Sequence, residues 1–426
     1  MNRVIGGLLV LGMMLSVRLI GQPTHGITLL TGAGMLLIFS YLAGKVGKFV
    51  RLPKITGYLL LGIFVGPSVS GLFTREMVSE LHLVNNLAVS LIALTAGAEI
   101  QLSWLRARAR IILWIMVWQN TVLMVLVASV LFLVRQWLPF MSGEHWHADL
   151  IISIVLGAFA VASSPSVVVA MIAETRASGP LSQTVLGVTV LKDVAVIVLF
   201  TLAIAVGKAL LGGQSIDSSV AWDLFRQISL SVVFGACIGI ALAAYIKLIG
   251  QEVPLVLIVV CFCMAEMEPL FHVEPLLMGM TAGFFLRNVF PGASELVIHG
   301  MEQLSLPVYC LFFGLAGLTL ETGALARLGI WALFFVCLRL IGLYLGTRLG
   351  AKMGRAEPRV RDHCWLGFVS QAGVTLAMAA IVAKTFPSWG PGVQTLTVTF
   401  IAIDQLVGPP LFKRALTKAG ETRTAD

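Results

Sequence analysis

The chain alternates long apolar segments with short polar loops along almost its whole length. A helix of about 20 apolar residues spans a bilayer, and about fourteen such segments can be placed here. They are predicted at residues 4–22, 27–50, 54–72, 83–103, 108–136, 149–174, 183–208, 225–249, 252–270, 273–290, 300–320, 325–350, 364–386 and 392–414. The pattern therefore predicts an all-α polytopic membrane protein with about 13–14 transmembrane helices.

Composition agrees with this pattern. The chain is 58% hydrophobic and 12% charged, whereas soluble domains carry about 25% charged residues. The formal net charge is +8, but the lysines and arginines gather in alternate loops, for example "GKVGKFVRLPK", "RARAR" and "TRLGAKMGRAEPRVR". Basic loops mark the cytoplasmic side of a membrane protein, so both termini are predicted to be cytoplasmic and no nucleic-acid partner is needed.

The ends of the chain add little to this plan. Residues 1–26 are predicted as an N-terminal helix, either a retained anchor or a signal-like segment. Residues 27–414 form the predicted membrane domain, and residues 415–426 form a short cytoplasmic tail. There is no phosphate-binding loop and no metal-ligand cluster in the sequence, so we expect no cofactor and no enzymatic activity.

The two halves of the membrane domain share weak internal similarity. Matching positions occur in the same order and at nearly constant spacing, which indicates one repeat at about 27–208, a linker helix at 225–249 and a second repeat at about 252–414. The second repeat begins after an odd number of crossings, so the repeats are inverted, as in secondary transporters. The matches are Gly62 and Gly66 with Gly279 and Gly283, Gly97 with Gly317, "SSPS" (163–166) with "SQAG" (370–373), and Asp193 with Asp404.

Two apolar segments at corresponding places in the repeats are interrupted near their middle. "FAVASSPSVVVAM" contains Pro165, which cannot donate a main-chain hydrogen bond, and "GFVSQAGVTLAM" contains Gly373. Backbone groups freed at membrane depth must be satisfied by neighbours or line a cavity. A matched pair of broken helices is the best pointer in a sequence to an ion site.

Charged residues inside the apolar segments are the remaining candidates. Asp193 follows Lys192 in the middle of "GVTVLKDVAVIVLF", and a carboxylate at that depth must pair, bind a cation or take up a proton. Arg339 lies within "FFVCLRLIGLYLG", and its guanidinium stays charged, so we expect it to form an ion pair within the core. Asp404 is interpreted as a structural carboxylate rather than a second ion site.

The ordered set of motifs "KITGYLLLGIFVGPSVSGLF", "GAEIQLSWL", "SSPSVVVAMIAE", "VLKDVAVIVLF", "LFFGLAGLTLE", "RLIGLYLGTRLG" and "SQAGVTLAMA" resembles the monovalent cation:proton antiporter family 2, which includes Kef-type and bacterial sodium/proton antiporters. The resemblance covers about residues 27–414. It implies a homodimer in the bacterial inner membrane, with a dimerisation domain and a mobile core in which two broken helices cross beside a carboxylate.

The resemblance also implies roles for single residues. Asp193 matches the ion-binding aspartate, and Arg339 matches the basic residue of the segment before the second broken helix. The first crossing would contain Ser163, Ser164 and Pro165, and the second would contain Ser370, Gln371 and Gly373, with Ser164 and Gln371 completing the site. Glu99 resembles the acidic position after a glycine, a structural or gating group.

Lys192 departs from the family pattern, which usually has Asp, Asn or Gln at this position. One interpretation is structural: the ammonium pairs with a carboxylate on another helix, with Glu99 and Asp404 as candidates. A second is functional, because a buried lysine loses its proton readily and can release one when a cation arrives. A third is loss of transport, with a tethered positive charge in the place of the cation.

These observations predict a secondary antiporter that exchanges Na⁺ or K⁺ for protons by alternating access at Asp193. An anion or organic-acid transporter on the same scaffold, with Lys192 and Arg339 as counter-ions, is one alternative. A transport-dead membrane sensor or subunit is another.

Overall fold

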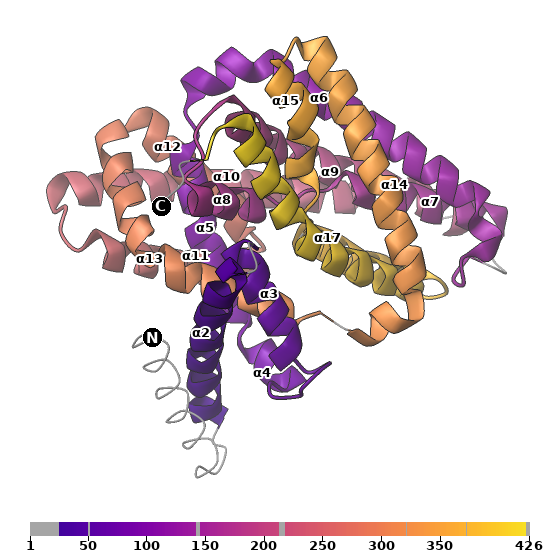
Figure 1. Ribbon diagram of the computed structural model, residues 1–426, viewed down its shortest axis with the longest axis horizontal. Helices are drawn as coiled ribbons and strands as arrows, with labels where there is room; N and C mark the ends of the chain where they lie inside the picture. The colour runs from indigo at the N-terminus through magenta and orange to yellow at the C-terminus, as the bar shows by residue number, and fades with distance from the viewer. Residues whose placement is uncertain are drawn as a thin grey trace. The chain divides into compact units, whose positions relative to one another are not determined.

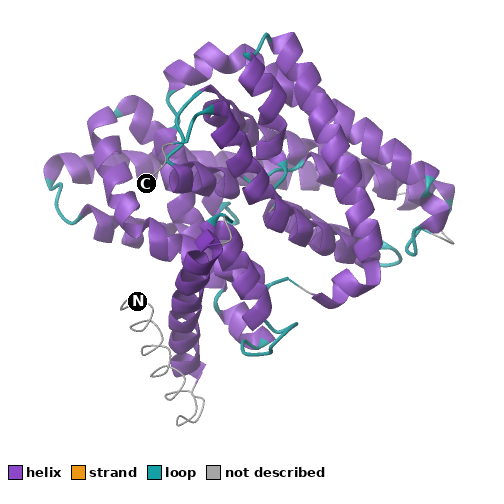
Figure 2. Cartoon of the chain, viewed as in Figure 1, coloured by secondary structure: helices purple, strands orange, loops and turns teal. Residues whose placement is uncertain are grey.

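The computed structural model describes residues 25–49, 52–141, 145–212, 218–320, 322–371 and 373–422. Helices joined by short loops make up these ranges, and they contain no strand (Figure 2). The predicted N-terminal helix lies almost entirely outside the described residues. The elements are α2 (His25–Phe49), α3 (Lys54–Val65), α4 (Arg75–Glu80), α5 (His82–Glu99), α6 (Leu102–Leu133), η1 (Arg135–Trp137), α7 (Trp146–Val161), α8 (Pro165–Thr175), α9 (Pro180–Gly212), α10 (Ser218–Leu248), α11 (Val253–Phe271), α12 (Pro275–Val289), α13 (Pro291–Leu318), α14 (Thr322–Gly354), α15 (Pro358–His363), η2 (Cys364–Phe368), α16 (Gly373–Thr385) and α17 (Gly390–Ala419).

The prediction of a polytopic helical membrane protein is confirmed. Within the described ranges, eight helical segments are long and apolar enough to cross a membrane. Shorter apolar helices lie at Gly32–Gly47, Lys54–Val65 and Val374–Thr385. Two of the predicted segments, 149–174 and 364–386, are each interrupted in their middle, as their sequences indicated.

One predicted segment is shorter than expected. Residues 54–72 were expected to form one span, but α3 ends at Val65. Gly66 and Pro67 follow at once, and Gly71 adopts a left-handed conformation with φ of 66°. Proline cannot continue a helix and glycine tolerates the turn, so this short sequence ends the helix and reverses the chain into α4.

The chain divides into two compact units. The first contains Met1–Leu102 and Gln227–Leu320, and the second contains Ser103–Arg226 and Glu321–Asp426. Each unit therefore combines a segment from the first half of the chain with a segment from the second half. The helices of each unit are labelled in Figure 1.

Close helix crossings on glycine hold the first unit together. A Cβ atom added to Gly62 of α3 would lie 2.2 Å from the Gly314 carbonyl oxygen of α13, and one added to Gly97 of α5 would lie 2.1 Å from the Met280 carbonyl oxygen of α12. Only glycine permits main chains to approach so closely, and small residues are the usual means of helix packing in membranes. The glycines thus bring α3 onto α13 and α5 onto α12.

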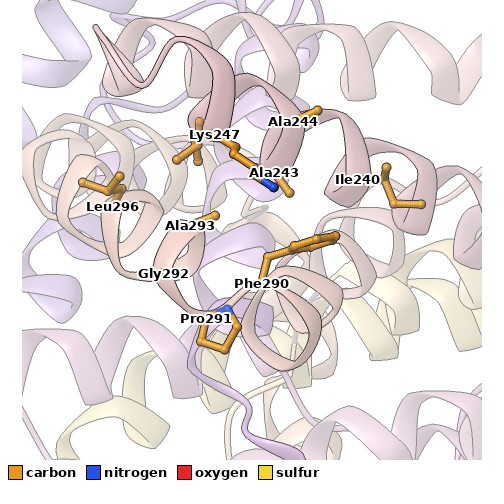
Figure 3. Close-up of a pocket in the computed structure, with 10 residues that line it drawn as sticks. Ile240, Ala243, Ala244, Lys247, Phe290, Pro291, Gly292, Ala293 and Leu296 are labelled. Carbon is orange, nitrogen blue, oxygen red and sulfur yellow. The ribbon is translucent and has the colours of Figure 1, made fainter.

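The first unit also contains an apolar cavity of about 520 Å³. It lies between α10 and the start of α13, as Figure 3 shows, and Lys247 is the charged residue among those that line it. The site residues predicted from the broken helices belong to the second unit, so this cavity is not the predicted ion site.

In the second unit, α6 packs against α14 along a row of four α14 glycines spaced four residues apart. These are Gly342, Gly346, Gly350 and Gly354. Cβ atoms added to Gly346 and Gly350 would lie 2.7 Å from the Cα of Gln119 and 2.5 Å from the Cα of Ile115. Residues four apart share one face of a helix, so the row forms a groove in which the α6 backbone is fixed.

The C-terminal segment caps the helix that carries Lys192 and Asp193. The Glu421 carboxylate accepts hydrogen bonds from the main-chain N–H groups of Leu181 at 2.6 Å and Ser182 at 2.8 Å. Both groups belong to the first turn of α9, where N–H donors have no helical partner and negative charge is favourable. The contact holds the start of α9 against the end of the chain.

We expect Glu421→Ala to lower the free energy of unfolding by about 1.5–3 kcal/mol, the usual contribution of hydrogen bonds to a charged group. Thermal unfolding in detergent measures the change. Glu357→Ala is the matched control, because the partly exposed Glu357 carboxylate pairs with Arg108 at 3.1 Å. The hydrogen bond from Arg108 lowers the pKa of the Glu357 carboxyl. Surface pairs contribute about 1 kcal/mol or less, so equal losses in the two variants would contradict the capping role.

Candidate functional site

The first break separates α7 from α8 within the second unit. α7 ends at Val161, and Pro165 occupies the first turn of α8, where its missing N–H costs nothing. The Ser164 side chain caps α8 by accepting a hydrogen bond from the Val167 N–H at 3.3 Å. The serine–proline pair thus ends one helix and starts the next, and it leaves the last carbonyls of α7 without helical partners.

The second break separates the short η2 helix from α16. Ser370 and Gln371 lie in it, and α16 begins at Gly373. The two breaks are joined directly, because the Ser164 main-chain N–H donates to the Ser370 carbonyl at 2.8 Å. The predicted meeting of two broken helices is therefore confirmed.

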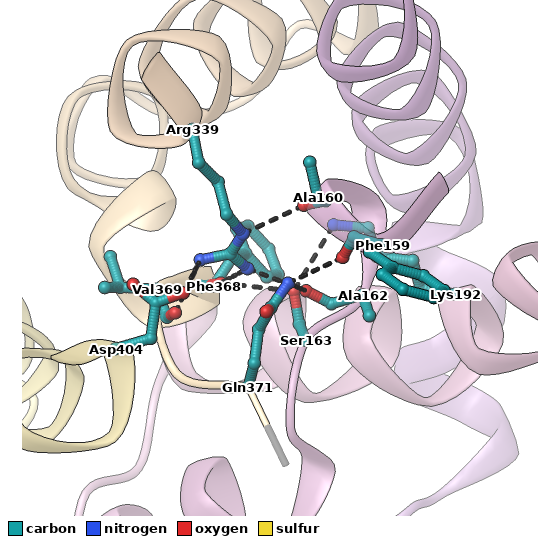
Figure 4. A network of polar contacts seen from close by, with 10 residues as sticks. All are labelled: Phe159, Ala160, Ala162, Ser163, Lys192, Arg339, Phe368, Val369, Gln371 and Asp404. Atoms are coloured by element: carbon teal, nitrogen blue, oxygen red, sulfur yellow. Dashed lines mark hydrogen bonds and ion pairs between the residues drawn. The ribbon is translucent and has the colours of Figure 1, made fainter. Parts of the chain in front are cut away.

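Arg339 of α14 joins the two breaks from the side. Its side chain is fully buried, and its five N–H donors reach four main-chain carbonyls and one carboxylate (Figure 4). The carbonyl partners lie at 2.6 to 3.0 Å and belong to Ala160, Ala162, Phe368 and Val369. A guanidinium has five donors, so none is left over. Arg339 therefore supplies the partners that the ends of two half-helices lack.

Asp404 of α17 is the carboxylate that balances this charge. Its Oδ2 atom accepts from the Arg339 Nη1 at 3.0 Å, and both side chains are fully buried. The ion pair expected for Arg339 is thus formed, and the structural role expected for Asp404 fits its position. A buried ion pair is tolerated where a single buried charge is not. The other carboxylate oxygen, Oδ1, is buried and accepts no hydrogen bond from the described residues.

Gln371 extends the same network from the second break to the first. Its Nε2 donates to the carbonyls of Phe159 at 2.7 Å and Ala162 at 3.0 Å. Its Oε1 is buried and accepts no hydrogen bond from the described residues. An amide oxygen held in this way beside a helix break is a suitable ligand for a hard cation.

Lys192 lies in α9, fully buried, and points toward α6 and the first break. Its Nζ donates to the Gln119 Oε1 at 2.6 Å and to the Ser163 Oγ at 3.3 Å. It also lies 5.4 Å from the centre of the Phe368 ring, within range of a cation–π contact.

These contacts differ from those of the structural interpretation of Lys192, in which its ammonium pairs with a carboxylate. Asp404 is paired with Arg339, and Glu99 belongs to the first unit at the end of α5. The acceptors that the Lys192 ammonium meets in the described part of the chain are neutral, an amide and a hydroxyl. The difference arises because α6 packs against α9 at this level, and Gln119 is the α6 residue that lies next to the Lys192 ammonium.

Asp193 follows Lys192 in α9 but has a different environment. Its side chain is half-buried, whereas Lys192 is fully buried. Consecutive residues on a helix diverge by about 100°, so the two side chains leave α9 in different directions. The ammonium is directed into the packed network, and the carboxylate is the more accessible of the two.

The structure thus brings together most of the residues that the sequence singled out. Lys192, Arg339, Asp404 and both breaks form one network, whereas Glu99 lies in the other unit. Gln119 and Thr347, which connect Lys192 to α6 and α14, were not predicted from the sequence. The signal available for Gln119 was a pair of adjacent amides, Gln119 and Asn120, in the apolar run "IILWIMVWQNTVLMVLV".

Known proteins share the sequence pattern and the fold of this chain. The family model for the sodium/hydrogen exchanger transmembrane domain matches residues 34–418. The chain belongs to the sodium/hydrogen exchanger family. This is a family of membrane transporters and not of enzymes, in agreement with the interpretation of the sequence.

Two relatives match this family member over nearly their whole length. The ammonium/H⁺ antiporter subunit AmhT of Alkalihalophilus pseudofirmus is 22% identical over 392 residues, which cover 91% of this chain and 93% of the relative. The Na⁺/H⁺-K⁺ antiporter GerN of Bacillus cereus is 23% identical over 403 residues, which cover 89% and 94%.

Solved structures show the same exchanger fold. A structure of the sodium proton antiporter MjNhaP1 from Methanocaldococcus jannaschii at pH 8 has a TM-score of 0.63 and 16% identity, and covers 93% of this chain and 97% of that chain. An electron-microscopy map of the same antiporter gives a TM-score of 0.71, also at 16% identity, with coverage of 93% and 98%. This likeness confirms the predicted antiporter fold.

Proposed function

We propose that this protein is a secondary antiporter that exchanges a monovalent cation, Na⁺ or K⁺, for protons by alternating access, with Asp193 as the exchanging carboxylate. The observation that carries the proposal is the joining of two broken helices beside α9, within a member of the exchanger family. Asp193 is half-buried and directly follows Lys192, whose ammonium donates to Ser163 in the first break, and this supports its assignment.

Exchange at one carboxylate needs only that proton and cation exclude each other. A carboxylate at membrane depth is costly when empty and charged, so it must carry one or the other to cross. The Gln371 Oε1, the Ser164 hydroxyl and main-chain carbonyls of the breaks are the oxygen ligands that would complete the cation shell. All five donors of Arg339 are occupied by carbonyls and Asp404, so Arg339 stabilises the two breaks. Asp193 is then the group whose charge changes during exchange.

The anion-transporter alternative is disfavoured by the same contacts. It requires Lys192 and Arg339 to bind the negative charge of a substrate. All five donors of Arg339 are occupied by internal acceptors, and Lys192 is fully buried with its ammonium directed to Gln119 and Ser163. An anion would have to displace these contacts before either residue could bind it.

We extend the proposal to the organisation of the molecule. Inverted repeats at about 27–208 and 252–414, joined by the helix at 225–249, are supported by the paired glycine crossings of the first unit and the paired breaks of the second. We expect both termini to be cytoplasmic because basic loops alternate along the chain. The resemblance in sequence supports a homodimer in the bacterial inner membrane.

The test is a pH-gradient dequenching assay with purified protein in liposomes. An acidic interior is established, and Na⁺, K⁺, Li⁺ or NH₄⁺ is added outside; ammonium is included because one relative is an ammonium/H⁺ antiporter subunit. We expect at least one of these cations to collapse the gradient, whereas choline does not. If no cation moves protons and an anion gradient drives transport, the anion alternative is correct. If no gradient produces flux, the chain is a sensor or subunit.

A further inference from the structure

The surroundings of Lys192 raise the question of how a buried ammonium and an ion-binding carboxylate coexist at adjacent positions of one helix. The Lys192 side chain is fully buried, yet its hydrogen bonds go to neutral acceptors, of which Gln119 is the closest at 2.6 Å. An ammonium buried without acceptors is strongly unfavourable. Gln119 is therefore the main partner that permits Lys192 to remain in this position.

The orientation of the Gln119 side chain is fixed by hydrogen bonds at both ends of its amide. Its Nε2 donates to the Thr347 Oγ1 of α14 at 2.7 Å, and both side chains are fully buried. An amide whose nitrogen is used in this way must present its oxygen to Lys192 (assigned from the hydrogen-bond network). Rotating the amide would turn its NH₂ group toward the Lys192 ammonium, which has donors only, and would lose the bond to Lys192.

The backbone of Gln119 is fixed as well. Its Cα lies against Gly346, where an added Cβ would approach to 2.7 Å. Gly346 immediately precedes Thr347 in the sequence. The glycine groove of α14 thus holds α6 at the level where the amide must bridge Thr347 and Lys192.

We propose that Gln119 is a positioning residue for ion exchange, which draws the Lys192 ammonium toward α6 and so lessens its competition with the transported cation for the neighbouring Asp193 carboxylate. The inference rests on the proposed function of Asp193. Without an acceptor on α6, the ammonium must find another partner, and the adjacent carboxylate on α9 is an anion within the reach of a long lysine side chain. Lys192 would then compete with the cation for Asp193.

The expected result for Gln119→Leu is an increase of about tenfold in the cation concentration that gives half-maximal exchange, at an unchanged maximal rate. Full-length variants are compared in the dequenching assay. Asn120→Leu is the matched control, since it makes a similar change at the next position of α6, which has no hydrogen bond with Lys192. We expect this control to keep the cation dependence of the wild type. If Gln119→Leu does not fold, Gln119→Asn, whose shorter amide falls short of Lys192, is expected to change the cation dependence in the same direction.

A variant without Lys192 distinguishes a positioning role of Gln119 from a role in packing alone. In a Lys192→Asn background there is no ammonium to redirect, so Gln119→Leu is expected to leave the half-maximal cation concentration unchanged. An equal increase in both backgrounds, or no increase in either, would overturn the inference while leaving the exchange function intact. If the wild-type protein moves no protons with any cation, the proposed function and this inference both fail.

Discussion

Asp193→Asn is expected to reduce cation-dependent proton movement to the level of protein-free vesicles. Asparagine has nearly the same shape as aspartate but can neither carry the negative charge that attracts a cation nor accept the proton that replaces it. Asp193 is half-buried in α9 and directly follows Lys192, whose ammonium donates to Ser163 in the first break. The dequenching assay measures the loss for each cation that the wild-type protein transports.

Two variants show that the loss is specific to this carboxylate. Asp193→Glu keeps the charge and the proton-binding group, so partial exchange should remain with an altered cation dependence. Glu76→Gln, which neutralises an exposed carboxylate in α4, should exchange as the wild type does. Full exchange by Asp193→Asn would refute the assignment of Asp193 as the site.

Arg339→Leu is expected to destabilise the protein severely, by at least about 3–5 kcal/mol, the usual cost of breaking a buried ion pair. The substitution leaves the Asp404 carboxylate and the four carbonyls of the two breaks without the Arg339 donors. Thermal unfolding in detergent, followed by the fluorescence of the nine tryptophans, measures the change. Loss of the folded peak in size-exclusion chromatography is the equivalent result if little protein survives purification.

The control for Arg339 lies on the same helix. Arg348 is about half exposed and contacts Tyr344 and Asp362 at the surface, so Arg348→Leu should cost about 1 kcal/mol or less. Arg339→Lys should resemble Arg339→Leu, because three donors on one nitrogen cannot serve five separated acceptors. If Arg339→Leu were as stable as the wild type, the breaks would not depend on the hydrogen bonds of Arg339.

The helices and their interruptions could be predicted because both depend on local sequence. Apolar segments of the right length, and the "SSPS" and "SQAG" interruptions, specify spans and breaks without knowledge of the partners. The end of α3 was misjudged, since Gly66 and Pro67 stop the helix even though the following residues stay partly apolar. Here the turn residues ended the helix although the apolar character of the sequence continued.

The partners of the buried charges could not be predicted in the same way. Arg339 and Asp404 are far apart in the sequence, and their pairing depends on how α14 packs on α17. One interpretation of Lys192 paired it with a carboxylate, but the packing of α6 into the glycine groove of α14 places Gln119 there instead. The glycines spaced four apart are visible in the sequence, yet the helix that occupies their groove is decided by the tertiary fold.

The central claim, that cation and proton compete for Asp193, is tested most directly by measuring proton release on cation binding. Purified protein in weakly buffered detergent solution, at the pH of half-maximal exchange, receives the transported cation while a pH indicator is followed. If they compete, we expect proton release from the wild-type protein and none from Asp193→Asn. Equal release from both proteins, or cation binding by the wild type without release, would contradict it.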